Sequence, residues 1–234
     1  MNTQKIIAPL LMLVCFWAAG CSVKKEDTPV QSQQRTQLQE QQRIAAQTAQ
    51  TYKAMDNAAL LQKLSEQSAR QKEPFNSLAY RELVTRKDVD SGSLVALING
   101  KKNGDSLLPL LLLRKLDEKT YSQIPVEVRA SVLTDALQRS KTFNSWGLPN
   151  FYLEDASKAL LECGKSADPA LRRMLSDTRP APVFGGKEHM VYERYKYRLC
   201  DYALFFLKRI QGDAKFELPM PPSDRDSLIK ALPM

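Results

Sequence analysis

The sequence predicts an all-α protein built mainly of stacked helical hairpins. Apolar residues recur at three- and four-residue steps over most of the chain, whereas the alternation typical of strands is nearly absent. Glycine and proline residues separate the helical stretches at short intervals. About 200 residues after the N-terminal segment suffice for one core or one short repeat array. We therefore expect a short α-solenoid that a long helix precedes.

Residues 1–20 have the features of a secretory signal peptide. Lys5 supplies a positive start, the apolar run from Ile6 to Trp17 is too short to span a bilayer stably, and small side chains follow. The sequence Ala18-Ala19-Gly20-Cys21 resembles the cleavage and lipidation box of bacterial lipoproteins, although Leu is more usual where Ala18 stands. The resemblance implies that Cys21 carries diacylglycerol on its thiol and an acyl chain such as palmitate on its amine.

The lipid on Cys21 would fix where the protein resides. Two or three acyl chains hold a protein stably on a membrane that it does not cross. Ser22 follows the cysteine, which resembles the outer-membrane default of lipoproteins rather than the aspartate that often retains them on the inner membrane. We expect the periplasmic face of the outer membrane. The alternatives are an ordinary cleaved signal with a chance cysteine, or a weak membrane anchor.

Two segments of different character follow the cysteine. Residues 21–35 are polar and lack aromatic side chains, so we expect a flexible tether. Residues 36–72 are rich in glutamine and contain neither Gly nor Pro, which predicts one long helix or two joined helices. The first half has a thin apolar stripe and would form a free stalk or a weak coiled coil. The second half, with Leu60, Leu61 and Leu64, should pack on the core.

Residues 73–234 form the predicted helical-repeat domain. Pro74 ends the preceding helix, and Asn76-Ser77 can cap the next one. Asp105 can cap an apolar helix, and Pro125 suits the start of another. In chain order we expect helices from about residue 77 to Arg86, from Ser91 to Ile98, from Ser106 to Leu116, from Pro125 to about Ser140, and from Ser223 to Leu232.

Residues 154–177 give the clearest repeat unit. Ala156 and Ala159 lie on one apolar helical face, Gly164 can end that helix in a left-handed conformation, and Pro169 suits the start of a second helix. This helical hairpin resembles a HEAT repeat, which has small residues where its helices cross, a glycine in the turn, and an aspartate after the second helix, here Asp177.

A second unit follows at a shift of 47 residues, which aligns Ala156 with Ala203 and places Gly212 one residue past the position of Gly164. This period is at the upper edge of HEAT spacing, and a loop insertion over residues 179–187 would account for the excess. The resemblance implies hairpins that bury their apolar faces only by stacking, with capping units at the ends.

The charge balance indicates which kind of partner the protein can bind. The formal net charge is +8, yet Lys and Arg are spread along the chain among Asp and Glu. Together with the expected compartment, this distribution argues against nucleic acid and favours a surface near anionic envelope material.

Cysteine and histidine usage leaves little for metal or redox chemistry. Cys163 and Cys200 are the pair that remains after Cys15 and Cys21, and they form either one disulfide or two buried thiols. With one histidine, His189, and no CxxC motif, we expect neither a metal site nor a cofactor. His189 lacks an identifiable nucleophile and orienting group, so we expect an exposed loop residue.

Four residues form the candidate binding surface. Trp146 lies in a Gly/Pro turn, residues 143–150, and is either a buried plug or an exposed anchor. In the segment with Tyr192, Arg194 and Lys196, aromatic rings alternate with cationic side chains. This pattern could bind polysaccharide or single-stranded nucleic acid. Helical spacing from Tyr195 onward instead favours a core position for most of these rings.

We expect a noncatalytic, membrane-anchored lipoprotein that presents its helical-repeat surface to an envelope protein, with its oligomeric state open. One alternative is an assembly or pilot lipoprotein for an envelope complex. Another is a cell-wall or polysaccharide-binding module, or an enzyme, that uses the Trp146 loop. A pocket that joins this loop to residues 184–198, with binding or activity that Trp146→Ala abolishes while the protein still folds, would support the last class.

Overall fold

The computed structural model describes residues 29–100, 103–141, 145–181 and 186–233. The chain divides into two units, Met1–Ala45 and Ala46–Met234, which are treated separately. Cys21, the signal peptide and most of the predicted tether lie outside the described residues.

The described residues are mostly helical, as predicted, with one short antiparallel hairpin. The α-helices are α1 (Pro29–Ala54), α2 (Asn57–Ala69), α3 (Leu78–Leu83), α4 (Ser91–Asn99), α5 (Leu107–Leu116), α6 (Glu118–Gln123), α7 (Val126–Arg139), α8 (Asp155–Glu162), α9 (Asp168–Met174), α10 (Gly186–Tyr195), α11 (Leu199–Ile210) and α12 (Pro222–Lys230). The remaining elements are the 3-10 helices η1 (Pro74–Asn76), η2 (Asn103–Ser106) and η3 (Gly164–Ala167) and the strands β1 (Gly147–Leu148) and β2 (Tyr152–Leu153).

The glutamine-rich segment forms two joined helices, one of the two predicted alternatives. Helix α1 begins at Pro29 rather than near residue 36, so residues 29–35 are helical and not a tether. Proline is tolerated in a first helical turn, and the polar residues after it are mostly good helix formers. Asp56 separates the two helices and caps α2 by accepting the Ala59 amide at 2.7 Å. Leu60 and Leu64 of α2 are fully buried.

The predicted helices of the middle region are present, with two differences at their ends. Ser77 caps α3 through the Tyr80 amide at 3.1 Å, as predicted, but α3 ends already at Leu83. Asp105 does not cap α5, because η2 intervenes; it pairs instead with Arg139 at 3.4 Å. Helix α6 was not predicted, and Asp117 caps it.

At residues 154–177 the two predicted helices, α8 and α9, are present with η3 between them, but α9 packs mainly on α11 rather than back on α8. Helix α8 is followed by Gly164, whose φ of 55° lies in the left-handed region, and Pro169 stands in the first turn of α9. Ala156 and Ala159 are fully buried.

The segment between α9 and α11 differs from the prediction. Tyr195 and Tyr202 were expected on one helical face, but Lys196, with φ of 48°, separates α10 from α11. His189 lies on α10 rather than in a loop, and its side chain is exposed. Gly212, with φ of 106°, follows α11 as predicted.

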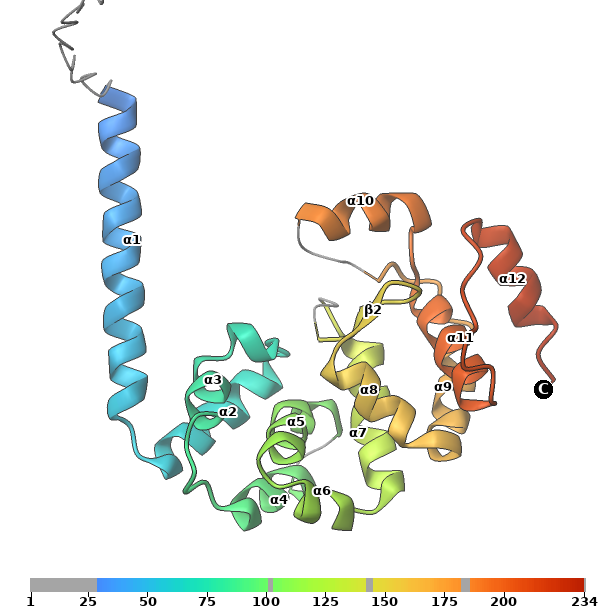
Figure 1. Ribbon diagram of the computed structural model, residues 1–234, viewed down its shortest axis with the longest axis horizontal. Helices are drawn as coiled ribbons and strands as arrows, with labels where there is room; N and C mark the ends of the chain where they lie inside the picture. The colour runs from blue at the N-terminus through green and yellow to red at the C-terminus, as the bar shows by residue number, and fades with distance from the viewer. Residues whose placement is uncertain (1–28, 101–102, 142–144, 182–185, 234) are drawn as a thin grey trace, which may run out of the picture. The chain divides into compact units, whose positions relative to one another are not determined.

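The second unit has one hydrophobic core that runs from Leu60 to Leu232. Within it, α10 lies beyond β2 from α8, out of chain order between α9 and α11 (Figure 1). Helix α2 packs on α3, α4 on α5, α5 on α6, α7 on α8, and α9 on α11. The structure describes no helix that combines the length and the apolar character needed to cross a bilayer.

Candidate interaction site at the β1–β2 hairpin

The hairpin β1–β2 forms because of one glycine. Gly147 pairs with Leu153, and Leu148 pairs with Tyr152. Gly147 has φ of 75°, and a Cβ there would lie 2.4 Å from the Tyr152 carbonyl oxygen. Only glycine accepts both the left-handed conformation and this close approach.

Side chains from distant parts of the chain hold the hairpin. The buried hydroxyl of Tyr202 donates to the Gly147 carbonyl at 2.7 Å, and that of Tyr197 donates to the Pro149 carbonyl at 2.9 Å. Burial raises the pKa of Tyr202 well above its ordinary value, so its hydroxyl remains a donor. Asn150 exchanges two hydrogen bonds with the backbone of Leu218, at 2.9 and 2.8 Å. The hairpin is therefore fixed from α11 and from the segment before α12.

Trp146 is a buried plug rather than an exposed anchor. Only 1% of its surface is exposed, and it borders a cavity of about 20 Å³ with Leu108 and Ala136. Its ring meets that of Phe206 edge to face, with the ring centroids 6.4 Å apart. The assignment of Trp146 to a binding surface is therefore wrong, because its indole fills the space between the hairpin and the helices.

A pocket of about 560 Å³ lies beside the hairpin and joins it to α10. Leu111 of α5 is its buried apolar member, whereas Phe75 is half-exposed and Tyr152 is partly exposed. Figure 1 shows β2 between α8 and α10. The residues that line the pocket are Pro74, Phe75, Leu111, Ser145, Tyr152, Glu154, Asp155 and Glu188.

Three carboxylates belong to this pocket. Glu154 and Asp155 begin α8, and Glu188 lies in the first turn of α10, where acidic residues are favoured by the helix dipole. Tyr152 donates its hydroxyl to Glu188 Oε1 at 2.5 Å. Partial burial, together with the neighbouring carboxylates, raises the pKa of Tyr152. Lys158 Nζ lies 3.8 Å from Asp155 Oδ1, an exposed and loose ion pair. None of the described lining residues is basic.

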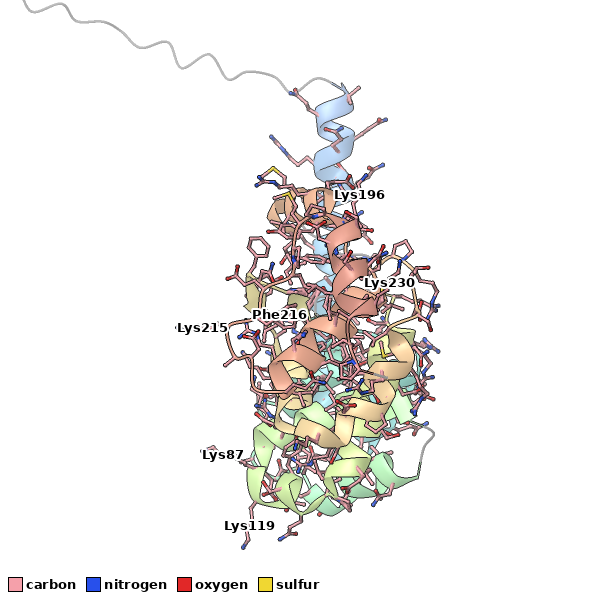
Figure 2. All side chains as sticks on the ribbon, turned by 90° about the vertical axis from the view of Figure 1, so that its right-hand side faces the viewer. Lys87, Lys119, Lys196, Lys215, Phe216 and Lys230 are labelled. Atoms are coloured by element: carbon pink, nitrogen blue, oxygen red, sulfur yellow. The ribbon has the colours of Figure 1, made fainter. Side chains whose placement is uncertain are left out.

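The other three residues of the predicted binding surface do not line this pocket. Tyr192 is half-buried against the core, and Arg194 and Lys196 are exposed. Figure 2 shows Lys196 and Lys119 toward opposite ends of the second unit. Helix α10 contributes Glu188 to the pocket instead. The pocket does connect the predicted turn with residues 184–198.

Phe75, Tyr152 and Glu188 were not predicted as site residues. Nor were Glu154 and Asp155, since the helix dipole alone accounts for acidic residues at the start of a helix. The sequence did carry a signal for two of these residues. Tyr152 lies next to a predicted turn and Phe75 next to a proline, and helical periodicity requires an aromatic ring at neither position.

Cys163 and Cys200 are free, buried thiols in the structure, so the disulfide alternative is not formed. The Cys163 thiol donates to the Ala159 carbonyl oxygen at 3.3 Å. Burial raises the pKa of both Cys163 and Cys200 to about 11, which keeps them protonated at neutral pH.

Among the described residues, no group of three or more His, Cys, Asp or Glu side chains is arranged to hold a metal ion. No protein-family model, curated protein or solved structure matches this chain.

Proposed function

We propose that this protein is an envelope lipoprotein, anchored through Cys21 at the periplasmic face of the outer membrane, and that it acts as a noncatalytic protein-interaction scaffold. The observation that supports the scaffold role best is the pocket between the hairpin and α10. Its exposed rings, Phe75 and Tyr152, belong to η1 and to β2. Exposed aromatic side chains around a pocket are typical of protein-binding sites.

We further propose that the second unit is a short HEAT-like solenoid. The small buried residues of α8, the left-handed Gly164 and Pro169 in α9 support this proposal, as does the packing of α9 on α11. A solenoid presents an extended surface on which several segments contribute to one binding site. The pocket has this character, because it draws residues from η1, α5, the hairpin and α10.

Site-directed photocrosslinking in intact cells tests the scaffold role. A photoreactive residue at position 75, which is exposed beside the pocket, should give a discrete crosslinked envelope protein. The matched control is position 119, on α6. Crosslinks of equal yield at both positions, or none at position 75, would contradict the proposal.

Intact mass and membrane fractionation of the wild type and of Cys21→Ser test the anchor. The wild type should carry a lipid-sized mass increment and sediment with membranes, and the variant should lose both. An unlipidated wild type would exclude the anchor but would leave the scaffold role open.

The same pocket also favours one alternative, a cell-wall polysaccharide-binding module, since exposed rings and carboxylates together can bind sugars. Co-sedimentation with purified peptidoglycan tests it. Sedimentation that Phe75→Ala abolishes would support this alternative, and a protein that stays in the supernatant would exclude it.

A further inference from the structure

We propose that the pocket at the hairpin binds a basic segment of a partner protein and takes up the side chain of an arginine or lysine. The inference rests on the proposed scaffold function and adds the chemistry of the partner. It stands on the charge of the pocket, on its apolar walls, and on its volume.

The charge of the pocket is opposite to that of the chain. Glu154, Asp155 and Glu188 line it, whereas the whole chain has a formal net charge of +8. Glu154 occupies the N-cap position of α8 but accepts no capping hydrogen bond through its side chain. Its carboxylate is therefore available to an incoming cation. On a chain with a net positive charge, a basic segment would be attracted to this acidic pocket.

The walls suit the rest of a long basic side chain. Leu111 and Pro74 can contact the methylene groups of arginine or lysine, and the rings of Phe75 and Tyr152 can lie against the cationic end. The hydrogen bond from Tyr152 to Glu188 fixes one ring and one carboxylate relative to each other. Charge-assisted hydrogen bonds to carboxylates would then orient the bound cation.

The arrangement of the lining residues favours a peptide over a metal ion. None of the three carboxylates belongs to a cluster of three or more acidic, His or Cys side chains able to hold a metal among the described residues. A pocket of about 560 Å³ with both carboxylates and apolar walls is better matched by an extended segment with a long side chain than by one small ion.

Fluorescence anisotropy with the purified full chain in detergent tests the inference. The probe is a dye-labelled eight-residue peptide of alternating arginine and leucine. The matched peptide has citrulline in place of each arginine, which keeps the shape and removes the charge. We expect binding of the arginine peptide that weakens with salt, and at least tenfold weaker binding of the citrulline peptide.

Two pairs of variants assign the binding to the pocket. Glu154→Gln combined with Glu188→Gln should weaken peptide binding about tenfold or more, whereas Glu118→Gln on α6 should not. Phe75→Ala should also weaken it, whereas Phe151→Ala should not. Phe75 and Phe151 are 52% and 53% exposed, but only Phe75 lines the pocket. Circular dichroism confirms that the variants fold.

Three results would overturn the inference: no binding of the arginine peptide, equal binding of the citrulline peptide, or unchanged binding in the double Glu→Gln variant. Binding to phosphatidylethanolamine vesicles that the double variant loses, without peptide binding, would assign the pocket to a lipid amine instead. If crosslinking captures a partner and the double variant captures it equally, the scaffold stands and this inference fails. If the arginine peptide binds but crosslinking captures no partner, the inference about the pocket stands and the scaffold role fails.

Discussion

The guanidinium of Arg225 in α12 lies against the carboxylate of Asp201 in α11, with Nε 3.2 Å from Oδ1 and both side chains fully buried. Arg198 joins them, since its Nη2 is 2.9 Å from Asp201 and 2.7 Å from Asp226. The Arg225 guanidinium also donates to the Tyr195 carbonyl at 2.7 Å. These charged side chains connect α12 to α11, the helix whose Tyr202 holds the hairpin.

Removal of the buried carboxylate should be the most damaging change in this cluster. Asp201→Asn leaves Arg225 buried without its counter-charge, so we expect a loss of about 3–5 kcal/mol in the free energy of unfolding. Arg225→Met should cost less, because Arg198 still neutralises Asp201. Urea denaturation measures both. The double variant should be more stable than Asp201→Asn alone; strictly additive losses would contradict the coupling.

The exposed pair Lys63–Glu66 provides the control for this series. Its side chains are 41% and 40% exposed, at a distance of 3.0 Å. Lys63→Met should change the free energy of unfolding by less than about 1 kcal/mol.

Gly147→Ala should disrupt the hairpin more than a glycine change elsewhere. The added Cβ would meet the Tyr152 carbonyl at 2.4 Å in a left-handed backbone, so we expect a loss of more than about 2 kcal/mol. Gly164→Ala is the matched control, because its φ is also positive but nothing lies within 4 Å of the new Cβ. It should cost about 1 kcal/mol. Equal melting temperatures for the two variants would contradict this explanation.

The ionisation of Asp117 should make the stability of the fold depend on pH in the acid range. Hydrogen bonds from the Thr120 hydroxyl and amide and from Ser91 lower the pKa of Asp117 to about 2. Because this is below the value of about 3.9 in an unfolded chain, the stabilisation is present above about pH 4 and is lost as pH falls toward about 2. The difference in melting temperature between wild type and Asp117→Asn should therefore shrink over that range. Thr120→Ala should reduce the same pH dependence; a constant difference would show that Asp117 acts without its charge.

Cys163 and Cys200 should resist thiol reagents in the native protein. With pKa values of about 11, only about one thiol in a thousand is ionised at pH 8, and both are buried. In a Cys15→Ser/Cys21→Ser chain, maleimide labelling should be slow in buffer and should reach two groups per chain in urea. Fewer than two in urea would reveal a disulfide.

Local sequence determined much of the helical framework. Ser77, Gly164 and Pro169 act on residues within four positions, because caps, left-handed turns and first-turn prolines depend on the nearest backbone groups. The helices α8 and α9 and the left-handed Gly164 after α8 were predicted correctly for this reason. The start of α1 at Pro29 was missed because a polar composition alone does not separate a tether from an exposed helix.

Tertiary structure alone decided where the candidate site lies and which residues form it. The hydroxyls that hold the hairpin belong to Tyr197 and Tyr202, 48 and 55 residues from their acceptors. The pocket wall adds Phe75 from η1 and Glu188 from α10. Local periodicity marks a ring as apolar but does not specify what covers it, so Trp146 became buried while Phe75 and Tyr152 remained at the surface.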